Sequence, residues 1–142
     1  MFTRKGSAQW QGGLKDGKGE VSTQSGALKD QPYGYNTRFE DKPGTNPEEL
    51  IGAAHAACFS MALSMILENA GVTDAQIETT SAVTLEKQGE GFAITKAHLT
   101  TTVSGKGDEA AIRKATEDAK AGCPVSKLLK AEVTMDATIN AA

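Results

Sequence analysis

The most distinctive pattern in the chain is a long apolar segment with helix signals at both ends. From Leu50 to Leu67 there is no Asp, Glu, Lys or Arg, and a helix of that length spans about 27 Å. Asn46 can cap the helix, Pro47 suits its first position, and Glu49 stands where a capping box places its carboxylate. Gly71 offers a C-terminal stop. The pattern predicts one long helix between Asn46 and Gly71.

This helix has little polar surface to present to water. A helix that is apolar nearly all round must be buried nearly all round, and a lone 142-residue domain has little material to surround it. A membrane span is an alternative by length, but the segment is only mildly apolar and nothing else in the chain indicates a membrane. Four small residues would let a second copy approach closely: Ala53, Ala54, Ala56 and Ala57. We therefore expect a homodimer built through this helix, and no membrane contact.

The segment after the helix has the alternation of β-strands. Residues 77–85 alternate imperfectly between apolar and polar side chains, which favours a half-buried strand. The glycines of 89–91 predict a turn, and Phe92–Val103 reads as a second strand. Its apolar phase slips between Ile94 and Ala97, which predicts a β-bulge there.

The last third of the chain predicts two helices and a strand. Asp108–Gly122 has an amphipathic pattern, with an inner stripe of alanines and one isoleucine. Cys123 precedes Pro124, which suits the first position of a short helix. The chain then alternates with a clean period of two, and the apolar positions are Val133, Met135, Ala137 and Ile139.

Residues 1–45 predict short strands joined by glycine-rich turns. Glu20–Thr23 and Tyr35–Phe39 have the β-branched or aromatic content of strands. The whole order is then strands, long helix, two strands, helix, short helix and strand. We expect an α+β fold with mostly antiparallel sheet rather than a βαβ wind, in a single domain over residues 1–142.

Charge and cysteine content narrow the function classes. The formal net charge is −3, so the chain lacks the basic footprint of a nucleic-acid-binding protein. Arg4 and Lys5 are not followed by an apolar segment, so no secretory signal is expected. Two cysteines are too few for a disulfide scaffold. We expect a cytoplasmic protein whose thiols, if they have a role, act through reactivity.

The two thiols have several interpretations. Cys58 lies mid-way along the apolar helix, where a cysteine is often an inert core residue. Cys123 stands at a helix boundary, where free backbone amides lower the pKa of a thiol, although it could simply fill a cap position. His55 and Cys58 are three apart, and with Cys123 or His98 they could bind zinc, but no Cys-x-x-Cys is present. His55 alone is better explained as a hydrogen-bonded core histidine. Serine-hydrolase and nucleotide-binding motifs are absent from the sequence.

A reactive Cys58 would need a nearby cation, because a thiolate in an apolar setting is costly. Arg38 is the candidate, held by a carboxylate at the helix start. Glu48 is ten positions from Cys58, about 15 Å along a straight helix. A carboxylate delivered by the partner chain, holding an arginine against the thiolate, would solve this separation, and the sequence leaves open whether Arg38 and Glu48 act within one chain or across two.

Three segments of the chain surround the residues discussed above: Gln31–Glu40, Gly44–Leu63 and Lys120–Ser126. Together they resemble the OsmC (osmotically inducible protein C) family, whose sister group is the organic hydroperoxide resistance (Ohr) family. The resemblance implies antiparallel sheets wrapped around long central helices in an intertwined homodimer. It also implies a thiol-dependent peroxidase for organic hydroperoxides, slower with hydrogen peroxide, without cofactor or metal. An external dithiol, such as a lipoylated or thioredoxin-like protein, would be the reductant.

The resemblance assigns roles to four residues. Cys58 corresponds to the peroxidatic thiol and Cys123 to the resolving thiol. Arg38 corresponds to the family's arginine, and Glu48, rather than Glu49, to its glutamate.

Two further interpretations belong beside these roles. Tyr33, Phe39 and Phe59 are candidates for an apolar wall that would favour organic peroxides. The competing hypothesis is a non-enzymatic stress protein, or a dimer that binds a metal or small molecule, with structural thiols.

Overall fold

The computed structural model describes all residues from 1 to 142, and its chain divides into two compact units, Met1–Leu50 and Ile51–Ala142. The first holds an antiparallel sheet of order β1-β2-β3, formed by Gly6–Gln11, Lys18–Thr23 and Gln31–Tyr33. It also holds helix α1 (Tyr35–Phe39) and the first turn of helix α2 (Pro47–Asn69). That residues 1–142 form a single domain stays a prediction.

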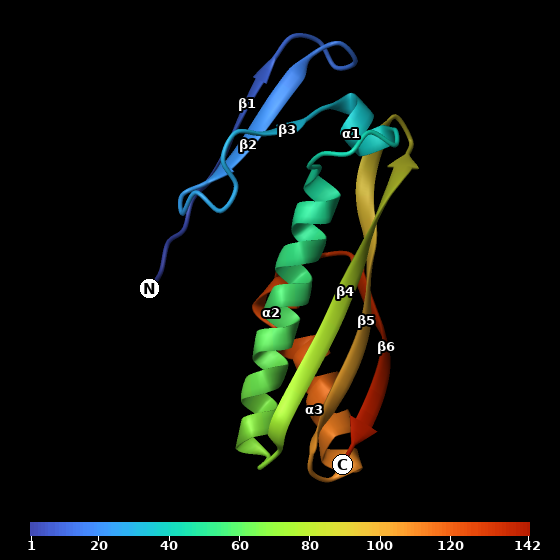
Figure 1. Ribbon diagram of the computed structural model, residues 1–142. Coiled ribbons are helices and arrows are strands. Elements are labelled where there is room, and N and C mark those ends of the chain that lie inside the picture. Colours follow the sequence, from blue (N-terminus) through green and yellow to red (C-terminus); the bar gives the residue numbers. More distant parts are fainter. The chain divides into compact units, whose positions relative to one another are not determined.

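The second unit places helices against one face of a three-stranded sheet (Figure 1). The sheet has the order β4-β5-β6, formed by Thr73–Gln88, Gly91–Lys106 and Glu132–Ala141. Helix α3 (Glu109–Gly122) and the short helix α4 (Pro124–Leu128) separate β5 from β6. Fully buried side chains from α2, β5 and α3 form the core: Phe59, Leu63, Leu67, Leu99, Val103, Ile112 and Ala119.

The predicted ends of the long helix are confirmed. The Asn46 side chain accepts a hydrogen bond from the backbone N–H of Glu49 at 2.8 Å, which is N-capping. At the other end Gly71 has a φ of +79°, and the N–H of Val72 bonds to the carbonyl of Leu67 at 3.0 Å. This is the Schellman arrangement, which favours glycine because only glycine adopts the left-handed conformation without strain.

Helix α2 buries one stripe of its surface within its own chain. The buried positions are Gly52, His55, Phe59, Leu63 and Leu67, which recur every three or four residues. The other face keeps Met61 76% exposed and Met65 59% exposed. This helix is long and apolar enough to cross a membrane. The core helices of soluble proteins can meet the same two criteria.

The β4–β5 hairpin follows its sequence pattern. Along β4 the half-buried positions alternate with exposed ones, as expected for a strand with one face on the core. The pairing shifts register where Thr84 opposes Lys96 and Leu85 opposes Ile94, so Thr95 is the extra residue of a bulge. The predicted bulge is therefore confirmed.

One local prediction was wrong. Tyr35–Phe39 is a helix, not a strand. The Thr37 hydroxyl accepts from the N–H of Gly34 at 2.9 Å and donates to its carbonyl at 3.0 Å. These local bonds turn the backbone and outweigh the weak strand preference of aromatic and β-branched residues.

The last strand adds one parallel pair to a fold that is mostly antiparallel, as predicted. β5 and β6 pair in parallel and are joined through α3 and α4, so one β-α-β connection is present in an otherwise antiparallel fold. The physical reason is that the helical crossover carries the chain back to the end of the sheet near which β5 begins, so β6 runs in the same direction as β5.

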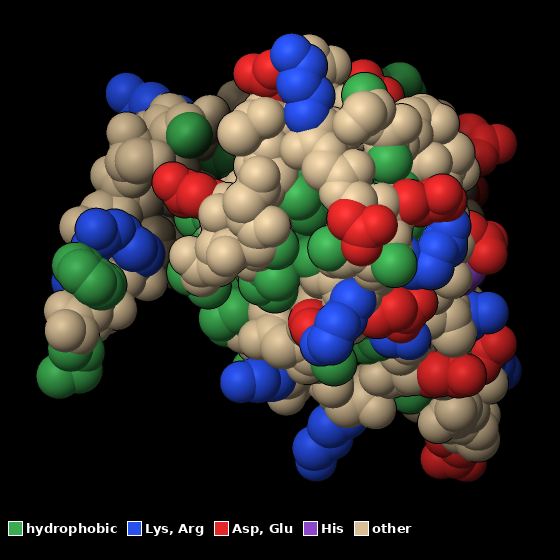
Figure 2. Space-filling model, turned by 90° about the horizontal axis from the view of Figure 1, so that it is seen from below, with side chains coloured by type: hydrophobic (Ala, Val, Ile, Leu, Met, Phe, Trp, Pro, Cys, Tyr) green, Lys and Arg blue, Asp and Glu red, His purple; other side chains and the backbone are tan.

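Acidic and basic side chains lie next to each other on the protein surface. Figure 2 shows acidic and basic groups intermixed over one face. On α3 they pair at helical spacing, as Lys114 does with Asp118 at 2.8 Å. Such exposed pairs contribute little to stability.

Candidate active site

The two cysteines, 65 positions apart in the sequence, meet in the second unit. Cys58 is half-buried on α2, and Cys123 is fully buried between α3 and α4. Both are free thiols, and their side chains hydrogen bond to each other. The fold therefore brings two reduced thiols together that are far apart in the sequence.

The surroundings of Cys58 favour its protonated form. Burial raises the pKa of the Cys58 thiol above its ordinary value of 9.0, and the neighbouring Cys123 adds to this increase. A hydrogen bond from the backbone N–H of Val125 acts in the opposite direction. A thiolate at neutral pH therefore needs a cation beyond these groups.

Cys123 ends one helix and begins the next. Its N–H bonds to the carbonyl of Ala119 at 3.0 Å, which closes α3. Its sulfur accepts from the N–H of Ser126 at 3.4 Å, which caps α4, as the Cys-Pro pattern predicted. The thiol also donates to the Ser126 hydroxyl at 3.1 Å.

His55 is the buried, hydrogen-bonded histidine that the sequence favoured. Its Nδ1 lies 2.7 Å from the hydroxyl of Ser81 on β4, and its Nε2 lies 2.8 Å from the hydroxyl of Ser126 on α4. Burial lowers the pKa of the imidazole, because desolvation penalises the charged form.

The alternative zinc set is not assembled. Both ring nitrogens of His55 face hydroxyls, and His98 bonds Thr134 and Asp136 on β6. No group of three or more His, Cys, Asp or Glu side chains is placed to hold a metal ion.

The burial of His55 predicts a pH-dependent stability. Because the pKa of His55 is lowered in the folded state, the unfolded chain binds a proton first as pH falls below 6.5. The stability contributed by neutral His55 is present above pH 6.5 and decreases below it, by at most about 1.4 kcal/mol per pH unit. We expect urea unfolding of His55→Gln to lack this decrease relative to the unsubstituted protein. Parallel stability profiles of the two proteins between pH 7.5 and about pH 5 would contradict it.

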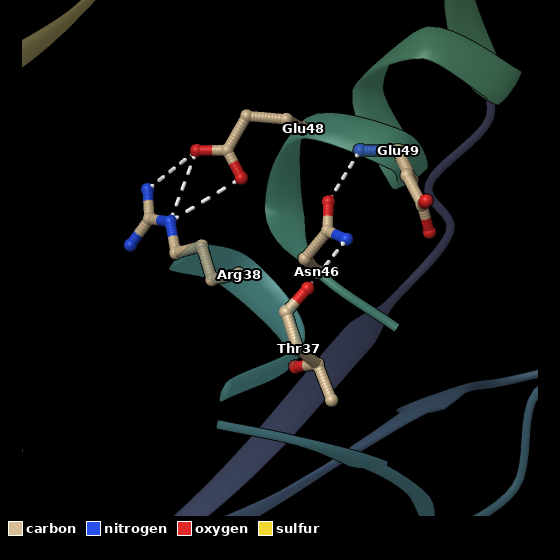
Figure 3. Close-up of polar contacts among 5 residues, drawn as sticks. All are labelled: Thr37, Arg38, Asn46, Glu48 and Glu49. Carbon is tan, nitrogen blue, oxygen red and sulfur yellow. Dashed lines mark hydrogen bonds and ion pairs between the residues drawn. The ribbon is translucent and has the colours of Figure 1, made fainter. Parts of the chain in front are cut away.

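Arg38 and Glu48 form a bidentate pair within the first unit (Figure 3). Arg38 Nε lies 3.0 and 3.2 Å from the two carboxylate oxygens of Glu48, and Nη2 lies 2.8 Å from Oε1. The Glu48 side chain is only 12% exposed and that of Arg38 35%. Two donors on one carboxylate fix the plane of the guanidinium.

The connection between α1 and α2 supports this pair. The Asn46 side chain caps α2 through Glu49 and donates to the carbonyl of Thr37 at 3.1 Å. Glu49 therefore takes part in the cap through its backbone, while Glu48 binds the arginine. The pair forms within one chain, so it needs no partner to bring its two members together.

The aromatic candidates have different surroundings. Phe59 is fully buried in the core, so it has no surface for a substrate. Phe39 is 37% exposed and lies under the Arg38 guanidinium at 5.5 Å. Tyr33 packs against Trp10. The predicted apolar wall is thus wrong for Phe59 and stays a prediction for Tyr33 and Phe39.

Sequence reasoning missed Ser126 and Ser81 as members of the network. Ser126 carried a usable signal, because a side chain three positions after a helix cap commonly interacts with that cap. Ser81 carried none, because its place opposite His55 depends on how β4 packs on α2.

Comparison with known proteins gives the family. The OsmC-like protein model matches residues 39–138. The chain is 59% identical to Peroxiredoxin OsmC of Escherichia coli K12 over 134 residues, 94% of each chain. It is 30% identical to an organic hydroperoxide resistance protein-like protein of Staphylococcus aureus USA300 over 101 residues, 70% of this chain and 72% of that one.

The crystal structure of the organic hydroperoxide resistance protein OhrB of Bacillus subtilis matches with a TM-score of 0.67 and 27% identity, covering 97% of this chain and 98% of that one. The expected α+β, OsmC-like fold is confirmed. The matched family model, the identity to a bacterial peroxiredoxin and the shared fold together show that the chain belongs to the OsmC family.

Proposed function

We propose that this protein is a thiol-dependent peroxidase that reduces organic hydroperoxides to alcohols, and hydrogen peroxide more slowly. Its relatives are a named peroxiredoxin and hydroperoxide resistance proteins, which support a peroxidase-type enzyme. The observation that carries the proposal is the contact between the Cys58 and Cys123 thiols. Two neighbouring thiols can be oxidised to a disulfide and then reduced again.

The first step is attack by the Cys58 thiolate on the peroxide. The sulfur electron pair forms a bond to the terminal oxygen and the O–O bond breaks. The alkoxide leaves and takes a proton, so the products are an alcohol and a Cys58 sulfenic acid. The sulfur is oxidised and the peroxide is reduced.

The second step joins the two cysteines. Cys123 attacks the Cys58 sulfenic acid, a disulfide forms and water is released. An external dithiol then reduces the disulfide by thiol–disulfide exchange, and we propose a lipoylated or thioredoxin-like protein in that role.

Arg38 is the cation that we propose for the Cys58 thiolate. Burial and the neighbouring Cys123 raise the pKa of Cys58, so a cation such as an arginine is needed to favour the charged form at neutral pH. Glu48 would orient that arginine, and the bidentate hydrogen bonding of its carboxylate to the guanidinium supports this role. A guanidinium there would also stabilise charge that develops on the peroxide oxygen.

We propose that the enzyme acts as an intertwined homodimer in the cytoplasm. The exposed face of α2 carries Met61 and Met65 beside the small residues Ala53, Ala54 and Ala57. An apolar face of this kind on a 23-residue helix favours burial against a second copy.

The test is the consumption of cumene hydroperoxide by the purified protein with dithiothreitol, beside hydrogen peroxide and a protein-free blank. We expect turnover well above the blank, faster with cumene hydroperoxide, and a Cys58–Cys123 disulfide by peptide mass after peroxide alone. Cys123→Ser should instead accumulate a sulfenic acid that dimedone traps. A folded protein with free thiols that turns over no faster than the blank would favour a binding protein with structural thiols.

A further inference from the structure

A buried chain of hydrogen bonds leads away from Cys123. The Cys123 thiol donates to Ser126 Oγ at 3.1 Å, and Ser126 Oγ lies 2.8 Å from His55 Nε2. On the far side of the ring, His55 Nδ1 lies 2.7 Å from Ser81 Oγ. Cys123 and His55 are fully buried and Ser126 is 8% exposed. The peroxidase steps described above use neither His55 nor Ser126.

The direction of each bond follows from the first one. Because Ser126 Oγ accepts the thiol proton, its own single proton is free to point at His55 Nε2. Nε2 is then an acceptor, and Nδ1 carries the ring hydrogen and donates to Ser81. This tautomer belongs to the neutral imidazole, and burial lowers the pKa of His55 so that the neutral form prevails at neutral pH.

We propose that Ser126 and His55 form a proton relay that accepts the thiol proton of Cys123 during disulfide formation. This inference rests on the proposed peroxidase function. Ser126 touches the reacting thiol, and His55 is a positioning residue that acts through Ser126. A relay speeds this step because Cys123 is fully buried, so solvent is a poor acceptor for its proton at neutral pH.

The step balances without another oxidant. The S–H bond of Cys123 breaks, and its proton moves to Ser126 Oγ as the Ser126 proton moves to His55 Nε2. The Cys123 electron pair forms the S–S bond, the S–O bond of the Cys58 sulfenic acid breaks, and hydroxide leaves. The hydroxide takes a proton from solvent and the imidazolium returns one, so the net products are the disulfide and water.

The titratable groups in contact with this network are the two thiols. Helix α2 has no charged residue between Leu50 and Leu67, and the inward face of β4 around Ser81 is uncharged. On the neighbouring helices Lys127 is exposed, and Lys120 pairs with Glu117. A pH dependence of disulfide formation should therefore arise from His55 and the thiols rather than from a neighbouring charged residue.

Ser126→Ala removes the relay while keeping the backbone N–H that donates to the Cys123 sulfur. After mixing reduced protein with cumene hydroperoxide, quenched samples are assayed for dimedone-trapped sulfenic acid and for the Cys58–Cys123 disulfide. We expect unchanged sulfenic acid formation and disulfide formation slowed by about tenfold to a hundredfold. The slowed rate should recover as pH rises, because hydroxide then removes the thiol proton, and Ser126→Thr should restore the rate at neutral pH.

Ser60→Ala is the matched control. Ser60 also joins α2 to β4, through Thr79 at 2.8 Å, but it has no link to a thiol, so both steps should keep their rates. Equal disulfide rates in Ser126→Ala and the unsubstituted protein would overturn the relay alone. A slow rate that neither alkaline pH nor Ser126→Thr restores would overturn it in favour of a structural role. Absence of both sulfenic acid and disulfide in the unsubstituted protein after peroxide treatment would overturn the peroxidase function and the relay with it.

Discussion

Cys58→Ser should reduce peroxide turnover to the rate of the protein-free blank. A serine hydroxyl does not ionise at neutral pH and does not attack a peroxide, so the whole enzymatic acceleration, about 10⁶-fold or more, is expected to be lost. The substitution is small, and its hydroxyl can still accept the hydrogen bond from the N–H of Val125. The measurement is cumene hydroperoxide consumption with dithiothreitol.

Cys123→Ser separates loss of the nucleophile from general damage near the thiols. It removes the other member of the same contact, yet should still consume one equivalent of peroxide and form a Cys58 sulfenic acid. If Cys58→Ser keeps measurable turnover, the nucleophile assignment is wrong. If both variants lose the first oxidation while folded, the defect lies in the shared environment rather than in Cys58.

Arg38→Ala should slow the reaction with peroxide by about 10²–10³-fold, the usual effect of removing a charge-stabilising donor. In this variant burial and the neighbouring Cys123 outweigh the Val125 hydrogen bond, so the pKa of the Cys58 thiol should lie above 9.0 and the rate should keep rising through that pH. The unsubstituted protein should reach its plateau at lower pH. Thiolate absorbance and the pH profile of peroxide consumption measure both effects.

Three variants sharpen this test. Arg38→Lys keeps the charge but loses the two-point contact with Glu48, and Glu48→Gln keeps the shape but loses the charge, so each should have an intermediate effect. Arg113→Ala, on the exposed side of α3 and paired with Glu109 at 3.7 Å, is the matched arginine control and should leave the rate unchanged. An Arg38→Ala protein with the original pKa of Cys58 would refute the role of this cation.

Mixed dimers address which chain supplies the arginine. Since Arg38 and Glu48 pair within one chain, the informative mixture combines Arg38→Ala subunits with Cys58→Ser subunits. We expect activity to reappear in the mixture, because one site would then combine an intact Arg38 with the partner's Cys58. No recovery in confirmed mixed dimers would place both residues of a site on the same chain.

Local chemistry explains why so much of the fold could be predicted. The caps of α2 need only Asn46, Pro47 and Gly71, which act on their own backbone within a few positions. The bulge at Thr95 and the alternation of β6 are visible because strand periodicity is itself a local property. The wrong strand prediction at Tyr35–Phe39 also has a local cause. The strand preference of five residues is too weak to outweigh the hydrogen bond between the Thr37 hydroxyl and Gly34.

The sequence by itself determined the class of elements, the position of the long apolar helix and, through its resemblance to a family, which four residues to examine. Only the tertiary structure decided that β6 pairs in parallel with β5, that Cys58 meets Cys123, and that Arg38 binds Glu48 with two donors. It alone placed Ser81 and Ser126 on the two nitrogens of His55. The physical reason is range: capping and periodicity act over a few residues, whereas these contacts join positions up to 71 apart and exist only once α2, the sheet and α4 have packed together.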